Sequence, residues 1–264
     1  MITISDLYYY PVKSCKGIRL ERARIGKRGI DGDREFMVVD GTGRCLTQRD
    51  QARLALIQPE WNGHELTLSA PGTEKIVLTP EASGKLIRVE VWESILKADD
   101  QGNTIAAWLS DFLGTTCRLV HFAPDQVRGI DPEYRISETD QISFADAYPF
   151  LLLSESSLSD LNRRLDFPIP SDRFRPNIVI RGSEAYAEDS WDRIRAGGIV
   201  FKLAKPCARC VVTTIDQKTT EAGKEPLRTL ALYRRSSEGE VMFGWNMIHE
   251  ITGYVSIGDK VELL

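Results

Sequence analysis

The densest group of reactive side chains in the sequence lies between Lys205 and Asp216. These twelve residues include two cysteines, Cys207 and Cys210, and two cations, Lys205 and Arg209. A nearby cation lowers the pKa of a thiol and so favours the thiolate, which is the form that attacks electrophiles and binds metals. We therefore expect the chemistry of this protein to take place at these two thiols.

The residues around the thiols predict how the thiols are displayed. An alternating apolar run at Ile199, Phe201 and Leu203 predicts a strand that leads into the segment. Pro206 has no amide donor and a fixed φ, so we expect regular strand pairing to stop there. The residues at 211–215 are all β-branched, which predicts that the chain continues as strand.

A lone C-x-x-C pair has three other interpretations. A structural zinc site needs four ligands, and it is disfavoured because Cys15, Cys45, Cys117 and the three histidines are scattered along the chain. A thioredoxin-like redox pair opens a helix after a strand, so the strand predicted at 211–215 disfavours it without excluding it. Two thiols buried in a β core are the third interpretation, which the flanking Lys, Arg and Pro residues weaken.

Two other segments have compositions that suit an anion. The loop at 11–17, P-V-K-S-C-K-G, can wrap an anion with ammonium groups and backbone amides, although the residues alone favour a solvated turn. Arg173 and Arg175 stand just before a predicted buried strand and can bind a phosphate or carboxylate in a bidentate manner. An arginine pair bonded to loop carbonyls is an equally good interpretation of the second segment.

The overall composition excludes several classes of protein. The chain of 264 residues has a formal charge of −4 and a pI of about 5.6, so no global basic field attracts nucleic acid. No apolar run approaches the roughly 18 residues of a membrane span, and the first ten residues alternate instead of resembling a signal peptide. The five cysteines have no disulfide-framework spacing, which predicts a reducing, cytoplasmic location.

Short alternating runs dominate the sequence and predict a β-rich α+β fold. We expect a strand over 2–10, and a meander from Leu54 to Lys97 with turns at Asn62-Gly63, Pro71-Gly72 and Ser83-Gly84. Helices are predicted over 104–113, ending at Gly114, and after Ser154, and a strand is predicted over 227–234. The polar stretch at 124–141 places a boundary between two modules, 1–123 and 124–264.

Five segments together resemble a known family. K-P-C-x-R-C-x-x-T-T-x-D at 205–216 resembles the signature of MOSC-domain proteins, which bind the molybdenum cofactor, and more closely the branch containing the amidoxime-reducing components. P-V-K-S-x-K-G at 11–17 and G-D-R-x-F-M-V at 32–38 resemble the N-terminal β-barrel module of that branch. F-R-P-N at 174–177 and F-G-x-N at 243–246 also match. The resemblance implies an N-terminal β-barrel module followed by a MOSC β-barrel with peripheral helices.

The resemblance also implies roles for individual residues. The second cysteine of the family's pair ligates molybdenum, which makes Cys210 the implied metal ligand and catalytic residue and Cys207 a neighbour. A soft thiolate suits a thiophilic metal. Asp216 would orient either a cofactor amine or Arg209. The implied cofactor-binding residues are Lys13, Ser14, Arg34, Arg175, Asn177, Arg209 and Asn246.

The implied activity is the reduction of N-hydroxylated compounds to amines with a molybdenum cofactor, Mo-molybdopterin. The sequence shows no C-x₄-C-x₂-C iron–sulfur spacing, so we expect electrons from a separate ferredoxin- or flavin-type protein, with no nucleic-acid or membrane partner. Two other classes remain open. In the first alternative the protein is a carrier of sulfur or cofactor on Cys210. In the second it is a redox-thiol protein that uses Cys207 and Cys210 as a reversible disulfide.

Overall fold

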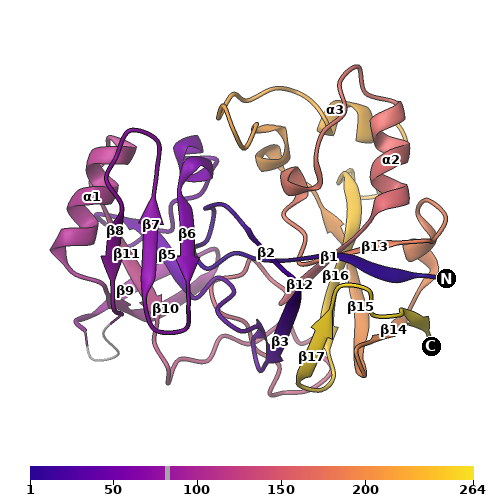
Figure 1. Cartoon of the computed structure of the whole chain (residues 1–264), viewed down its shortest axis with the longest axis horizontal. Coiled ribbons are helices and arrows are strands. Elements are labelled where there is room, and N and C mark those ends of the chain that lie inside the picture. The colour runs from indigo at the N-terminus through magenta and orange to yellow at the C-terminus, as the bar shows by residue number, and fades with distance from the viewer. Residues whose placement is uncertain (81–83) are drawn as a thin grey trace.

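The computed structural model describes residues 1–80 and 84–264, and its largest sheet has eight strands in the order β18-β14-β15-β16-β12-β13-β1-β2. These strands are β1 (Thr3–Tyr9), β2 (Ile18–Leu20), β12 (Phe150–Ser154), β13 (Ile178–Arg181), β14 (Arg193–Ala196), β15 (Ile199–Ala208), β16 (Met242–His249) and β18 (Glu262–Leu263). Figure 1 shows the indigo strand β1 beside the orange and yellow strands of the C-terminal half. The first strand of the chain therefore belongs to the sheet that carries the cysteine segment.

The apolar residues of β1 explain this position. Ile4 and Leu7 are fully buried, and they join a core cluster that includes Phe150 and Phe201 from the C-terminal half. β1 pairs antiparallel with β13, with Ile4 opposite Ile180, and β13 runs parallel to β12. Because β1 is fixed in this sheet, the loop at 11–17 that follows it is held close to the ends of β13 and β15.

Three smaller sheets complete the molecule, with strand orders β5-β11-β10-β9, β6-β7-β8 and β17-β3-β4. The first two form the left half of Figure 1, and their core contains Phe36, Val38 and Leu119. The strands are β3 (Arg22–Gly26), β4 (Gly29–Ile30), β5 (Phe36–Asp40), β6 (Gln58–Trp61), β7 (Leu66–Ser69), β8 (Ile76–Leu78), β9 (Leu86–Val91), β10 (Ser94–Asp100), β11 (Cys117–Phe122) and β17 (Gly253–Ser256).

The helices are few and lie outside the sheets. They are α1 (Asn103–Leu113), α2 (Glu155–Arg163), α3 (Leu227–Leu230) and the 3₁₀ turns η1 (Ala52–Leu56), η2 (Ser171–Phe174), η3 (Ala187–Ser190) and η4 (Val211–Thr214). The predicted helix at 104–113 is confirmed as α1. It ends at Gly114, whose φ of +69° suits glycine and whose amide donates to the Ser110 carbonyl at 2.8 Å.

The predicted fold class, a β-rich α+β protein with peripheral helices, is confirmed. The division of the chain at 123/124 stays a prediction, and the structure adds that β1 and β2 pair within the sheet of the C-terminal half. Of the turn predicted at Ser83-Gly84, Ser83 lies outside the described residues.

The expectation that pairing stops at Pro206 is wrong. β15 continues to Ala208 and stays paired with β16, with register shifts between Leu203 and Lys205 and between Pro206 and Ala208. Such irregularities allow a residue without an amide donor to stand in a strand. Both cysteines still lie near the end of the strand. Cys207 is the second-last residue of β15, and Cys210 lies two residues beyond its end.

Two other predicted strands are helical. After Cys210 the chain forms η4, because the Thr213 amide and hydroxyl both donate to the Cys210 carbonyl, at 3.1 and 3.0 Å. Such side-chain bonds to nearby carbonyls compete with strand pairing and override β propensity. The strand predicted at 227–234 is instead α3 and a following turn, in which the Leu230 amide donates to the Pro226 carbonyl at 2.9 Å.

Candidate functional site

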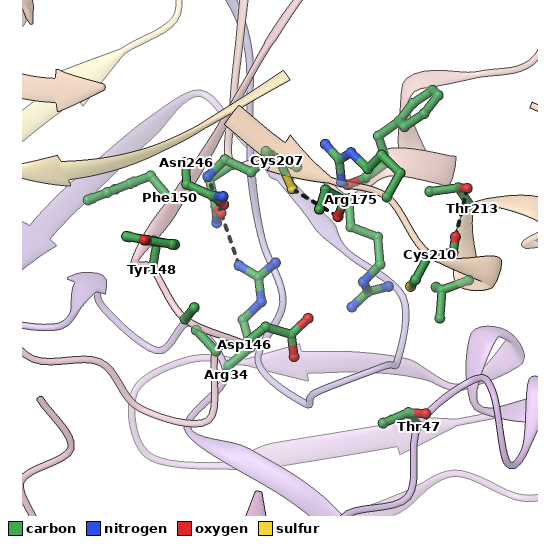
Figure 2. A pocket seen from close by; sticks show the side chains of 18 of the residues that line it. Arg34, Thr47, Asp146, Tyr148, Phe150, Arg175, Cys207, Cys210, Thr213 and Asn246 are labelled. Carbon is green, nitrogen blue, oxygen red and sulfur yellow. Dashed lines mark hydrogen bonds between the residues drawn. The ribbon is translucent and has the colours of Figure 1, made fainter. Parts of the chain in front are cut away.

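The eight residues that the sequence implied as cofactor or metal ligands all line one cavity of about 350 Å³. Figure 2 shows Arg34, Arg175 and Cys210 around this space, with Asn246 above Arg34. The N-terminal half contributes the loop after β1 and the turn before β5, and the C-terminal half contributes the approach to β13 and the ends of β15 and β16. The eight residues are Lys13, Ser14, Arg34, Arg175, Asn177, Arg209, Cys210 and Asn246.

Tyr10 supports two of these residues. The guanidinium carbons of Arg34 and Arg175 lie 4.3 and 4.2 Å from the centroid of its ring. Both arginines have a left-handed backbone, with φ of +51° and +56°, which is uncommon for residues other than glycine. The Tyr10 ring is buried and its hydroxyl donates to the Pro176 carbonyl at 3.0 Å. The ring thus fixes two like charges beside the same cavity through cation–π contacts.

Asn177 orients Arg34. Its Oδ1 accepts from Arg34 Nη1 at 3.0 Å and from the Leu151 amide at 3.2 Å, while its Nδ2 donates to the Tyr8 carbonyl at 3.1 Å and approaches Asp33 Oδ1 at 3.3 Å. The side chain is buried, so these protein contacts occupy its amide group. Its position in the structure is therefore that of a support for the arginine.

Two buried guanidinium nitrogens have no hydrogen-bond partner among the described residues. Arg175 donates from Nη1 to the Cys15 carbonyl at 2.7 Å, and Arg209 donates from Nε to the Phe243 carbonyl at 2.7 Å. The Nη2 atom of each arginine is buried and unpaired within residues 1–80 and 84–264. A buried donor without an acceptor is costly, so these two nitrogens fit an anionic or carbonyl-bearing ligand in the cavity.

Electrostatics support the same assignment. Burial, together with the nearby Arg34 cation, lowers the pKa of Arg175 from its ordinary value. Arg34 pairs with the buried carboxylate of Asp33, whereas Arg175 has no carboxylate partner among the described residues, so a ligand with negative charge would offset the charge of Arg175. The donor set of this cavity therefore fits the phosphate-bearing, sulfur-held cofactor that the sequence resemblance implies.

Lys13 has a carboxylate partner within the protein. Its ammonium group is buried, donates to the Phe144 carbonyl at 2.8 Å and pairs with Asp146. Burial works to raise the pKa of Asp146, but the Lys13 ammonium outweighs it and holds the pKa of that carboxyl well below its usual range. The assignment of Lys13 to a phosphate stays a prediction. Its next neighbour, Ser14, has a φ of +68° and accepts from Gln48 Nε2 at 2.7 Å through its carbonyl.

Cys210 lines the cavity from the position immediately before the η4 turn. Arg49 Nη2 lies 3.0 Å from Cys210 Sγ, and the Arg49 guanidinium stacks on the Trp92 ring with its carbon 4.7 Å from the centroid. The N-terminal half thus supplies a charge at the sulfur of the C-terminal half.

Cys207 lies in a different environment. Burial raises the pKa of the Cys207 thiol, more than the nearby Arg209 cation lowers it. A raised pKa keeps Cys207 protonated at neutral pH. The two thiols of the C-x-x-C pair are therefore chemically unequal.

Three residues of the cavity wall, Arg49, Trp92 and Asp146, escaped the sequence analysis. Arg49 belongs to a polar run after a strand, and Trp92 lies in a hairpin without a glycine turn signal, so neither carried a pattern pointing to this cavity. Asp216 is not part of the cavity wall. It pairs with Arg173, with 3.6 Å between Oδ2 and Nη1, and Arg173 also donates to the Thr213 carbonyl at 2.9 Å.

Comparisons with known proteins cover nearly the whole chain. Residues 1–116 match the MOSC N-terminal beta barrel domain, and residues 139–262 match the MOSC domain. The chain is 38% identical to "Mitochondrial amidoxime-reducing component 1" of Mus musculus over 99% of this chain and 82% of that protein, and 38% identical to its Homo sapiens counterpart over 99% and 83%. It is 33% identical to "Mitochondrial amidoxime reducing component 2" of Bos taurus over 98% and 82%.

These similarities overturn the prediction of a cytoplasmic location, because the similar proteins are named as mitochondrial components. All five cysteines are free in the structure, as expected in a reducing compartment. A reducing environment does not identify the cytoplasm, which is why the inference failed. In the part of the chain that the structure describes, no helix is both long and apolar enough to cross a membrane.

Proposed function

The chain belongs to the family of MOSC-domain proteins with an N-terminal beta barrel domain, and we propose that it reduces N-hydroxylated compounds to amines with a molybdenum cofactor held in the cavity around Cys210. The observation that carries the proposal is that Arg175 and Arg209 line the cavity with Cys210, and that each has a buried guanidinium nitrogen without a partner among the residues that the structure describes. A metal-bearing group with an anionic tail uses both features. The names of the similar proteins supply the substrate class.

Five residues of the cavity have a proposed task in binding the cofactor. Cys210 binds the metal through its thiolate, and Arg49 donates to that sulfur at 3.0 Å. Arg34 and Arg175, fixed by the Tyr10 ring, bind the anionic tail, while Asn177 sets the orientation of Arg34. When bound, the cofactor supplies the two-electron chemistry that removes oxygen from nitrogen, and the protein supplies position and charge.

Electrons come from a separate redox protein of the ferredoxin or flavin type in this proposal. Each turnover consumes two electrons, and the sequence has neither the iron–sulfur spacing nor a G-x-G-x-x-G turn after a strand that binds a dinucleotide. The partner is therefore expected to be required whenever NADH or NADPH is the ultimate donor.

Molybdenum-loaded protein is expected to reduce a hydroxylamine when a reduced viologen supplies electrons, and to be inactive with NADH or NADPH alone. Adding a ferredoxin- or flavin-type reductase system should restore turnover with the nicotinamide donor. The measurement is amine formed per chain, with protein purified without molybdenum as the control. Turnover with NADH and no partner would refute the partner requirement. Inactivity with viologen, in protein shown to contain molybdenum, would instead favour a carrier of sulfur or cofactor.

A further inference from the structure

Trp92 stands at the tip of the β9–β10 hairpin and reaches the wall of the cofactor cavity. Val91 pairs with Ser94, so Trp92 and Glu93 form the two-residue turn. Trp92 has a φ of +54°, while Glu93 is not among the residues of positive φ. A two-residue turn with a positive φ at its first position is normally built with glycine, since a side chain there is strained.

The protein therefore holds a bulky aromatic residue in a backbone conformation that favours glycine. Strain of this kind persists where the surrounding structure imposes it, and it concentrates at binding and catalytic sites. The sequence V-W-E-S has no other feature that calls for tryptophan in a turn.

A hydrogen bond and a cation–π contact fix the indole in place. Its Nε1 donates to Asp146 Oδ1 at 2.9 Å, and that same oxygen binds the Lys13 ammonium. The Arg49 guanidinium stacks on the ring, with its carbon 4.7 Å from the centroid, and its Nη2 reaches Cys210 Sγ. One guanidinium group thus separates the indole from the sulfur of the proposed metal ligand.

The remaining surface of the indole is open. Trp92 is 51% exposed although it contacts the ion pair of Lys13 and Asp146, and it lines both the cofactor cavity and an adjoining cavity of about 320 Å³. The Arg49 and Lys13 cations lie over the ring, and an aromatic side chain held in this way but half exposed beside the cavity is suited to stack a flat molecule. Stacking on an aromatic side chain tolerates different substituents on the ligand, since it requires only that the ligand has a π face.

We propose that Trp92 is a substrate-binding residue on which flat, conjugated N-hydroxylated compounds stack, such as an aromatic amidoxime or an N-hydroxylated heterocyclic base. The inference rests on the proposed reductase function and adds to it a preference within the substrate class. A small compound without a π face, such as hydroxylamine itself, gains nothing from the indole. The protein should therefore favour flat substrates because of this one side chain.

The test compares benzamidoxime with hydroxylamine in molybdenum-loaded protein driven by reduced viologen. Trp92→Gly removes the ring and suits the backbone, and its ratio of kcat/KM for benzamidoxime to that for hydroxylamine should fall about tenfold, a stacking loss of about 1.4 kcal/mol. Trp92→Phe keeps an aromatic face and should keep most of the ratio. Phe167→Gly is the matched control, because Phe167 is an exposed aromatic outside the cavity wall.

A binding measurement separates this inference from the reductase proposal. Calorimetry with benzamidine, the product, on loaded protein needs no turnover and should show binding about tenfold weaker in Trp92→Gly than in wild type. Weaker benzamidine binding by Trp92→Gly, together with an inactive wild type, would support stacking on Trp92 and count against the reductase proposal. An unchanged substrate ratio together with unchanged benzamidine affinity would overturn the proposed stacking on Trp92. An equal loss for both substrates, accompanied by loss of molybdenum, would overturn it too, since Trp92 would then serve only to position Arg49.

Discussion

Replacing Cys210 by serine is expected to abolish molybdenum retention, whereas Cys207→Ser should keep most of the metal. A serine hydroxyl is a hard, protonated donor and does not replace a thiolate at a thiophilic metal. Arg49 donates to the Cys210 sulfur, while burial raises the pKa of the Cys207 thiol and keeps it protonated. Molybdenum per chain, measured by mass spectrometry of the metal in both variants, checks the expectation.

The Cys207→Ser variant is the matched control, because it makes the same chemical change three residues away and at the same cavity. Equal loss of molybdenum in both variants would indicate a site in which two thiols bind the metal. Wild-type metal content in Cys210→Ser would remove the ligand assignment altogether. The far-ultraviolet circular dichroism of each variant should match wild type, since neither cysteine is part of a core cluster.

Loss of a cavity arginine should weaken cofactor binding without unfolding the protein. Arg175→Met keeps an apolar chain against Tyr10 but removes the donor. Cofactor binding should therefore lose the free energy of one charge-assisted hydrogen bond, about 1.5–3 kcal/mol, and affinity should fall roughly ten- to a hundredfold. The apoprotein should lose little stability, because burial and the Arg34 cation lower the pKa of Arg175 and make its charge unfavourable in the empty cavity.

Arg181→Met provides the comparison for this variant, since Arg181 is an exposed arginine at the end of β13 outside the cavity wall. It should retain both cofactor affinity and the thermal midpoint of wild type. The measurement is the fraction of cofactor that remains after dialysis, together with the thermal midpoint of the apoprotein. Full retention of cofactor by Arg175→Met, or a fold that no longer forms, would show that the arginine is a structural residue.

Sequence patterns and the family resemblance selected residues that the structure brings together, whereas they mispredicted some of the elements around them. Arg34, Arg175 and Cys210 each lie in a short motif of polar residues next to a strand, and the structure brings all three to one cavity. The β-branched run after Cys210 does not form the predicted strand, because Thr213 and Thr214 bond to carbonyls three residues back and favour a 3₁₀ turn.

The residues that sequence reasoning missed depend on tertiary contacts. Arg49, Trp92 and Asp146 are far apart in the chain, and each acquires its place in the cavity only through the others and through Lys13. The position of β1 also depends on tertiary contacts. Its alternation indicated a strand, but only packing against β13 determined that it joins the sheet of the C-terminal half. Periodicity describes which face is buried and does not name the partner.

The most direct test of the central claim is the molybdenum content of the wild-type protein purified from a host that makes the molybdenum cofactor. We expect about one molybdenum per chain, released with an equal amount of pterin when the protein is denatured, and no metal in protein from a host unable to make the cofactor. Folded protein free of molybdenum, from a host that loads another molybdenum enzyme expressed beside it, would contradict the assignment of this cavity.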